Sequence, residues 1–395
     1  ARLLERKAIE GEDGVTKPAV RLNRTAFYPT SGGQPYDTGT LGGQQVVEVV
    51  EDAQGEIWHL LSGPLKTETD TIEGEIDWRR RFDHMQQHTG QHLLSAACED
   101  IWGAKTTGFH LGSGESTIDL DIPQMSWEAA FRVENAVNRV VWEDRRVDVL
   151  IVDEDELSDI PLRKPPAVTG KIRVIWVEDY DASACGGTHV RRTGEIGLIK
   201  IVSLTRYKGG VRVGFLCGGR ALRHYQRSLH ILRTVSIGLS VGPDELPDAI
   251  DRLETEVKTT RKELGQVRDE LLTYEADRLW EATAATQGVR MVVTHLPDRT
   301  FDEVRAIAGQ LRERSKTLTL LGVAGENGLR VVCARSDDLA GIDAADLLRD
   351  VLKALGGRGG GSAVMAQGGA PPLSAERISE VFEDARAWAS ERICR

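Results

Sequence analysis

Two short motifs, far apart in the chain, carry residue types that bind metal ions. HTGQH places His88 and His92 four residues apart on a predicted helix, so both imidazoles leave the same helix face. CGGTH places Cys185 and His189 four residues apart in a glycine-containing loop that follows the apolar run KIRVIWV. Zinc prefers such a mixture of imidazole and thiolate donors, and four of them complete a tetrahedral shell. The pair of motifs therefore indicates a zinc site.

Each motif also has an ordinary structural interpretation. A helix with two histidines at this spacing is more often a partly buried polar face, and CxxxH alone is no more specific. Their joint occurrence favours a metal site without deciding the matter. His84 lies one turn before His88 and is a competing ligand or a residue that supports one. Four protein ligands would make a structural site, whereas a loosely held ligand would leave room for an activated water, and both roles stay open.

Composition limits the class of protein. The chain has 395 residues, a net charge of −11, 40% hydrophobic residues and 28% charged residues, which is ordinary for a folded protein of several domains. Its apolar runs fall far short of the ~20 residues that span a bilayer. The start, ARLLERKAIEGEDG, has no secretory signal, and the five cysteines are scattered and odd in number. We expect a cytoplasmic protein with no membrane partner.

The charge is unevenly distributed along the chain. Between Ser203 and Gly242 there is no Asp or Glu. The basic residues of this segment are Arg206, Lys208, Arg212, Arg220, Arg223, Arg227 and Arg233. The segment suits a polyanion that docks in one orientation, and it equally suits a solvated helix face whose arginines pair with acids elsewhere.

Hydrophobic periodicity predicts a multidomain α+β protein with four parts. Residues 1–80 show short β-type runs broken by Gly, Pro and Asp, which indicates a small antiparallel β-barrel or β-sandwich. Residues 81–240 combine helices at 81–102 and 126–143 with several strands, which indicates a two-layer α+β domain. Residues 241–287 predict a long helix or a coiled-coil hairpin, with Gly265 at a bend. Residues 288–395 predict an α/β domain that contains a glycine-rich loop at 356–369.

Four sequence blocks, in this order, resemble a known family. FYPTSGGQPYDTG (27–39), HMQQHTGQHLLSAA (84–97), FHLGSGESTIDLD (109–121) and CGGTHV (185–190) resemble the editing domain of alanyl-tRNA synthetase and the free-standing AlaX proteins. GRGGGSAVMAQGG (357–369) is similar to the signature of the DHHA1 domain. The resemblance covers nearly the whole chain and is closest to the long AlaX type.

The resemblance implies trans-editing, which is the hydrolysis of tRNA(Ala) mischarged with serine or glycine. It implies that His88, His92, Cys185 and His189 are metal ligands and that His88 and His92 take part in catalysis. It also implies two further sets of site residues. Those that face the amino-acid pocket are Thr30, Ser31, Gly32, Gly33, Gln34, Pro35 and His110. Those that grip tRNA are Gly357, Arg358, Gly359, Gly360 and Gly361.

Other functions are weighed against this one. Only 26 residues precede FYPT and no GxxxxGK[ST] loop occurs, so we expect neither aminoacylation nor ATP binding. A binding module with a structural zinc site, which only captures tRNA, remains an alternative. The absence of an Asp-His-His cluster from the sequence argues against a third alternative, a phosphoesterase. The resemblance also implies a homodimer, formed through the DHHA1-like domain or the helical linker.

Overall fold

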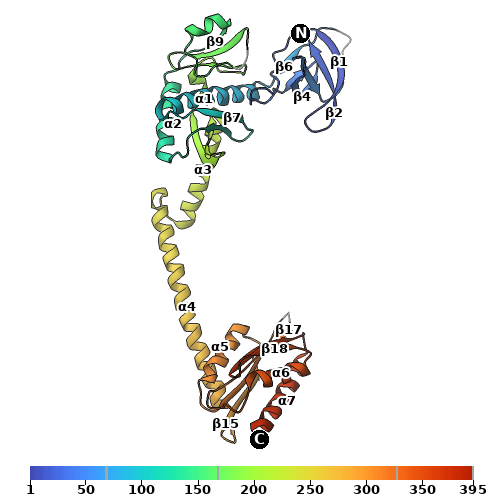
Figure 1. Cartoon of the computed structure of the whole chain (residues 1–395), viewed down its shortest axis with the longest axis vertical. Coiled ribbons are helices and arrows are strands. Elements are labelled where there is room, and N and C mark those ends of the chain that lie inside the picture. The colour runs from blue at the N-terminus through green and yellow to red at the C-terminus, as the bar shows by residue number, and fades with distance from the viewer. Residues whose placement is uncertain (67–69, 167–168, 326–327, 394–395) are drawn as a thin grey trace. The chain divides into compact units, whose positions relative to one another are not determined.

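The computed structural model describes residues 1–66, 70–166, 169–325 and 328–393 (Figure 1). The chain divides into two compact units, Ala1–Ser240 and Val241–Arg395. Helices occur in both units, and the described strands form three sheets in the first unit and one in the second, which confirms the predicted multidomain α+β class. Among the described residues, no helix is both long and apolar enough to span a bilayer.

The first six strands form one antiparallel sheet that closes on itself. Its strand order is β1-β2-β5-β4-β3-β6. The strands are β1 (Leu3–Glu10), β2 (Thr16–Leu22), β3 (Gly39–Leu41), β4 (Gln44–Glu51), β5 (Ile57–Leu61) and β6 (Gly74–Ile76). The two outer edges meet because Arg2 bridges Thr71 and the backbone N–H of Leu3 donates to Asp70 O at 2.7 Å. The predicted N-terminal β-barrel is therefore present.

Two helices cover a four-stranded antiparallel sheet in the rest of the first unit. The sheet order is β12-β13-β8-β7, and a second sheet of order β11-β10-β9 lies beside it. The helices are α1 (Trp78–Trp102) and α2 (Trp127–Trp142). The strands are β7 (Thr106–Leu111), β8 (Ser116–Leu120), β9 (Val147–Val152), β10 (Ile172–Val177), β11 (Asp181–Ala184), β12 (Ile199–Tyr207) and β13 (Gly210–Cys217). Leu94 from α1, Val137 from α2 and Phe215 from β13 are fully buried in one shared core. Short 3-10 helices occupy Glu154–Asp159 and Thr193–Ile196.

Helix α1 is the central element of this unit. The Asp77 side chain caps its first turn by accepting from Arg80 N, and Gly103 ends it in the left-handed region at φ 63°. All residues from Gln87 to Cys98 are buried, so its polar side chains must find partners inside the protein. Gln87, for example, exchanges two hydrogen bonds with the backbone of Cys217, at 2.8 and 3.1 Å.

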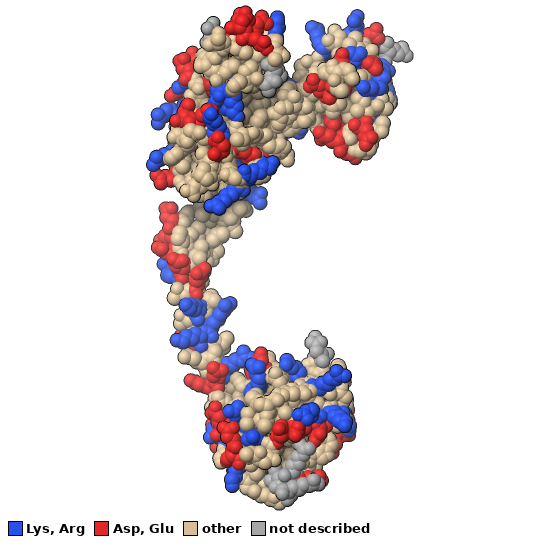
Figure 2. Space-filling view, in the orientation of Figure 1, with Lys and Arg blue, Asp and Glu red and all other residues tan. Residues whose placement is uncertain are grey.

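The basic segment forms the end of β12, β13 and a helix, α3 (Gly218–Leu239), which periodicity had not predicted. Some of its basic side chains pair with acids, as expected of an ordinary solvated face, and others stay unpaired, as expected of a segment that binds a polyanion. Arg212 pairs with Asp119 and Arg220 pairs with Asp83. Arg206, Lys208, Arg223, Arg227 and Arg233 are exposed and, within the described part of the chain, form no ion pair. On the face seen in Figure 2, basic and acidic side chains are interspersed over both units.

The second unit begins with a 3-10 turn at Pro243–Glu245 and one long helix, α4 (Leu246–Ala282). The predicted bend at Gly265 is wrong, because this residue lies inside an uninterrupted helix. A lone glycine weakens a helix by about 1 kcal/mol, which 36 other helical residues readily tolerate.

A six-stranded sheet of order β14-β15-β16-β17-β19-β18 forms the centre of the second unit. Helix α5 packs on one face, and α6 and α7 pack on the other. The strands are β14 (Ala285–Thr286), β15 (Val289–His295), β16 (Thr317–Gly325), β17 (Gly328–Arg335), β18 (Arg358–Gly361) and β19 (Met365–Ala370). The helices are α5 (Phe301–Arg312), α6 (Ala344–Ala354) and α7 (Ala375–Ile393).

The glycine-rich segment 356–369, predicted as a loop, is mostly an antiparallel hairpin of β18 and β19. Its glycines are needed for close packing. A Cβ on Gly359 would lie 2.6 Å from Leu352 Cδ1, and one on Gly368 would lie 2.3 Å from the same atom. Composition suggested a loop because glycine is rare in strands, and it occurs in them where another chain segment comes close.

Candidate metal centre and its cavity

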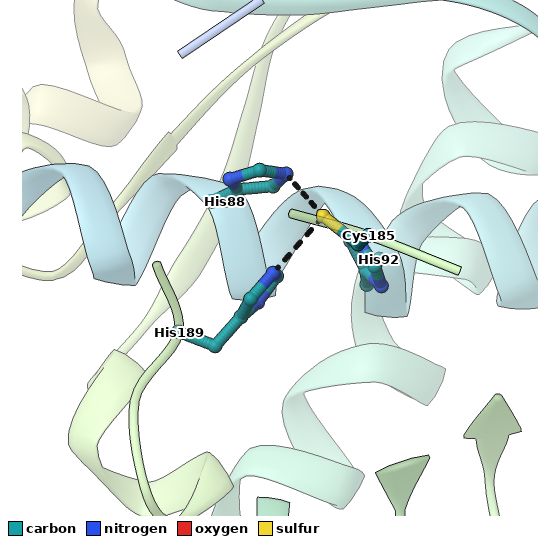
Figure 3. A group of neighbouring side chains, drawn as sticks. All are labelled: His88, His92, Cys185 and His189. Carbon is teal, nitrogen blue, oxygen red and sulfur yellow. Dashed lines mark hydrogen bonds between the residues drawn. The ribbon is translucent and has the colours of Figure 1, made fainter. Parts of the chain in front are cut away.

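The four predicted ligands lie together in the structure. His88 and His92 leave one face of α1, while Cys185 and His189 come from the loop after β11 (Figure 3). The ligand atoms of all four side chains lie within 4.8 Å of one another. The Nε2 atoms of His88 and His189 are each 3.4 Å from Cys185 Sγ. The arrangement therefore supplies one thiolate and three imidazole donors to one point.

Each imidazole is oriented through its other nitrogen. Nδ1 of His88 lies 2.8 Å from Gln34 Oε1, which only accepts, so this nitrogen carries the proton. Nδ1 of His189 lies 3.2 Å from the hydroxyl of Thr89. With its proton on Nδ1, His88 has a free lone pair on Nε2, which is the form that binds a metal ion. The Thr89 hydroxyl is able to accept from His189 Nδ1 in the same way.

His92 is oriented by a carboxylate. Its Nδ1 lies 3.5 Å from Asp181 Oδ2. Asp181 is itself held by Arg163, whose Nε donates at 2.8 Å, and by the Ser183 hydroxyl at 3.0 Å. A carboxylate behind a ligating histidine is a common feature of zinc sites.

The electrostatics of the cluster favour a thiolate. Burial alone would raise the pKa of Cys185, but the adjacent rings of His189, His88 and His92 outweigh it and lower the pKa to about 2. Burial lowers the pKa of His88, and it lowers the pKa of His189 to about 3. For His92, the contacts with Asp181 and Cys185 outweigh burial and raise the pKa. A thiolate beside three imidazoles is a donor set that zinc prefers, so the residues fit the predicted metal.

The CGGTH loop is shaped to approach α1. Nη1 of Arg173 donates to the carbonyl oxygens of Cys185 and Gly187, at 2.6 and 2.9 Å. A Cβ on Gly187 would lie only 2.1 Å from His88 Cε1, whereas one on Gly186 would meet nothing within 4 Å. Gly187 is therefore required for the loop to reach His88.

The cluster forms part of the wall of a cavity of about 670 Å³. His88, His92 and Cys185 line it together with Tyr28 and Phe109. The Phe109 ring lies 5.3 Å from the His88 ring, centroid to centroid. A cavity of this size, with donors converging on one wall, can admit a small substrate group.

The structure separates the predicted pocket residues into those that line the cavity and those that do not. Ser31 and Gly32 line it. Gly33 packs against Phe109, and Gln34 is fully buried behind His88. These residues form a tight turn with φ of +56° at Gly32 and +84° at Gly33. Because glycine alone adopts such angles readily, the turn can bring Gln34 to the metal ligands.

Three further predicted residues lie away from the lining. Thr30 is exposed and Pro35 is half-buried, and neither lines the cavity. His110 is exposed on β7 and also does not line it. The lining includes the four preceding residues of the same strand, Thr106 to Phe109, and ends before His110.

His84 is not part of the metal-binding group. It is 4% exposed and its Nδ1 has no hydrogen-bond partner. Burial lowers its pKa to about 4. His84 is therefore a buried neutral histidine rather than a ligand.

The predicted tRNA-gripping residues lie in the second unit. Gly357–Gly361 belong to the edge of its sheet, because β18 is the outermost strand, and Arg358 is exposed there. Gly360 is also exposed, with nothing within 4 Å of an added Cβ.

Residues that sequence reasoning missed are those that support the ligands. Thr89 lies inside the HTGQH motif, Arg173 lies within the predicted strand 171–177, and Asp181 lies between that strand and CGGTH. The signal that could have found them is the presence of charged residues near the predicted ligand loop. Their spacing in the sequence does not show which of these side chains turn toward the ligands.

Two family models match the chain. The model of the threonyl and alanyl tRNA synthetase second additional domain matches residues 172–213, which include Cys185 and His189. The DHHA1 domain model matches residues 288–391.

Relatives extend the match over most of the chain. The alanine–tRNA ligase of Pyrococcus furiosus is 35% identical over 88% of this chain and 39% of its own length. The alanyl-tRNA editing protein Aarsd1-B of Xenopus laevis is 36% identical over 62% of this chain and 60% of its own length. The alanyl-tRNA editing protein AlaX-L of Pyrococcus horikoshii is 30% identical over 93% of this chain and 91% of its own length.

The chain thus spans about two fifths of the ligase, whereas its match to AlaX-L runs nearly end to end in both proteins. The ordered motifs, the histidine and cysteine cluster and the DHHA1 domain agree with both relationships. The chain belongs to the alanyl-tRNA editing protein family.

Proposed function

We propose that this protein hydrolyses the ester bond that joins a wrong amino acid, serine or glycine, to tRNA(Ala). The observation that carries the proposal is the cluster of His88, His92, Cys185 and His189, of which the first three line a cavity of about 670 Å³. Family membership and the names of the editing relatives support the same reaction.

The proposed cofactor is zinc, held by the cysteine and the three histidines. When bound, zinc would supply Lewis acidity toward a water or an ester carbonyl. Gln34, Thr89 and Asp181 would keep the three imidazoles in the orientation and tautomer that ligation needs.

The cavity residues have proposed roles in binding the aminoacyl end. His88 and His92 lie closest to the reacting ester in this proposal and are its catalytic candidates. Ser31 and Gly32 form one wall, and the Phe109 ring closes another beside His88. The partners proposed for the tRNA body are the unpaired arginines of the basic segment and the exposed edge of β18 around Arg358.

A homodimer is proposed through α4. Its exposed apolar residues recur at alternating three- and four-residue steps, which is the pattern of a coiled-coil seam. They are Ile250, Leu253, Val257, Leu264, Val267, Leu271 and Tyr274.

A second candidate is a tRNA-binding module with a structural zinc. The favouring observation is that four donors fill a tetrahedral shell and leave no position for water. It is the weaker candidate, because a structural site has no need of a cavity beside it.

The test is deacylation of Ser-tRNA(Ala) and Gly-tRNA(Ala) by purified, metal-analysed protein, with Ala-tRNA(Ala) as the cognate comparison. We expect release of serine or glycine by the native protein and loss of release in His92→Ala. His110→Ala, which alters an exposed histidine outside the cavity, is the matched control. Tight, salt-sensitive tRNA binding without turnover would support the binding module instead.

A further inference from the structure

The lining of the metal-centre cavity has an unusual charge balance. The chain as a whole carries more acidic than basic residues, 61 against 50. The cavity lining nevertheless contains no Asp or Glu and four cationic residues. These are Arg163, Lys164, Lys171 and Arg173.

Two of the four cations have structural roles that the fold explains. Arg163 pairs with Asp181 and so supports His92. Arg173 donates to the carbonyl oxygens of the Cys185 loop. These contacts at least partly compensate the positive charges of both arginines.

Among the described residues, Lys171 has no such contact, and Lys164 makes a single hydrogen bond, to a backbone oxygen. Both are exposed at the cavity, and the described residues include no ion pair for either. Nζ of Lys164 donates to the backbone oxygen of Thr106, on the strand that carries Phe109. Partial burial and the neighbouring Arg163 lower the Lys164 pKa, so its charge is incompletely compensated and would be stabilised by an incoming anion.

The proposed substrate carries its nearest anion at a defined place. The ester lies on the terminal ribose, and the closest negative charge is the 5′-phosphate of the same nucleotide. An ester that reaches Cys185 brings this phosphate into the same cavity. The other charged group of the substrate is the α-ammonium of the amino acid, which two lysines would repel.

We propose that Lys164 and Lys171 bind the 5′-phosphate of the tRNA's terminal adenosine and so set the direction in which the aminoacyl end enters the cavity. The proposal rests on the proposed function for the identity of the substrate. In this arrangement the phosphate contacts the two lysines, and the aminoacyl group contacts other lining residues, which include Ser31 and Gly32. Lysine ammonium groups are common phosphate ligands, and each contact adds to the salt dependence of binding.

The first test compares two substrates that differ by one phosphate, 2′(3′)-O-seryl-AMP and 2′(3′)-O-seryl-adenosine. For the native protein we expect a higher kcat/KM for seryl-AMP than for seryl-adenosine. We expect this difference to arise from a lower KM for seryl-AMP. In Lys164→Gln/Lys171→Gln this preference falls about tenfold, the value of one or two charge-assisted hydrogen bonds. Lys164→Arg/Lys171→Arg retains most of it. Lys66→Gln, an exposed lysine outside the cavity lining, behaves as the native protein.

A binding measurement keeps the inference separate from the proposed reaction. Calorimetric titration with AMP and with adenosine needs no turnover, and we expect the native protein to prefer AMP and the double glutamine variant to lose that preference. Equal preference in the native and double-variant proteins overturns the inference. Absence of hydrolysis together with a lysine-dependent preference for AMP overturns only the proposed reaction. A thermal unfolding curve confirms that each variant is folded.

Discussion

Gln34 Oε1 accepts a hydrogen bond from His88 Nδ1 at 2.8 Å, and the same oxygen accepts from the backbone N–H of Thr188 at 3.0 Å. One buried amide thus connects the barrel, helix α1 and the CGGTH loop. Its Nε2 also donates to the Thr188 hydroxyl at 2.9 Å, which fixes the orientation of the amide. The barrel therefore takes part in building the metal centre although it supplies no ligand.

Replacing this amide tests its supporting role. In Gln34→Ala, His88 loses the acceptor that holds its tautomer, and we expect zinc affinity to fall about 10- to 100-fold. Competition with a chromophoric chelator measures the affinity. Gln54→Ala changes an exposed glutamine of the same barrel and should bind zinc as the native protein does. Equal affinities in the two variants would show that Gln34 does not orient the ligand.

The close approach of Gly187 to His88 predicts a selective loss of metal. The methyl group of Gly187→Ala would overlap His88 Cε1 and force the loop or the imidazole to move. We expect Gly187→Ala to lose most of the about one equivalent of zinc expected per chain, with all four ligands still present. Gly186→Ala places a methyl group in open space and should keep its zinc. Metal analysis after gel filtration measures both, and similar zinc contents would contradict the geometry.

The hairpin of the second unit predicts that its glycines are not equivalent. Gly359→Ala would bring a methyl group within 2.6 Å of Leu352 Cδ1, and overpacking of this kind typically destabilises a protein by about 1–3 kcal/mol. Gly360→Ala should leave stability within about 0.5 kcal/mol of the native value, because its added methyl group meets nothing. Urea unfolding of the full chain, followed through the transition of the second unit, distinguishes them. Equal midpoints would refute this packing role.

His84 predicts a specific dependence of stability on pH. Its pKa is about 4 in the folded protein, below the ordinary value of 6.5, so protons bind more tightly to the unfolded chain. Stability is therefore lost as the pH falls from about 6.5 toward 4, by about 2 kcal/mol from this residue at pH 5. His84→Asn should flatten this part of the stability curve, while the exposed His110→Asn should not. Identical slopes for both variants would exclude the assignment.

The exposed seam of α4 predicts that self-association depends on two side chains. Leu264 and Val267 are 66% and 61% exposed, respectively, although both are apolar. Leu264→Asp/Val267→Asp should convert a dimer to a monomer, as measured by light scattering, because it places charges in the seam. Gln266→Asp on another face of the helix should remain dimeric. If light scattering shows that the native protein is a monomer, the proposed dimer through α4 is wrong.

The ligand set was predictable because both motifs act locally. Four-residue spacing on a helix directs His88 and His92 to one face, and two glycines mark a loop that can fold around an ion. The partners of these ligands depend on contacts between distant segments. Gln34 meets Thr188 across 154 positions, and Thr89 meets His189 across 100. No pattern within one element reports such contacts.

The fold shows the same division between local and distant effects. Apolar periodicity predicted α2, including its cap at Ser126, because helix formation there follows from the segment itself. The hairpin at 358–370 was missed because its glycines are required by close packing against Leu352, which lies on another element. The bend at Gly265 was wrong because neighbouring helical residues outweigh one unfavourable residue.

The contact between Gln34 and the CGGTH loop also bears on how the chain folds. The metal centre needs the barrel turn, the middle of α1 and the loop after β11, so it is complete only after three distant segments have come together. Such long-range contacts form late and slowly during folding. An ion that binds only the completed centre then holds these segments together and stabilises the native state by an amount that rises with the logarithm of its free concentration. Zinc uptake during refolding should consequently lag behind the formation of secondary structure.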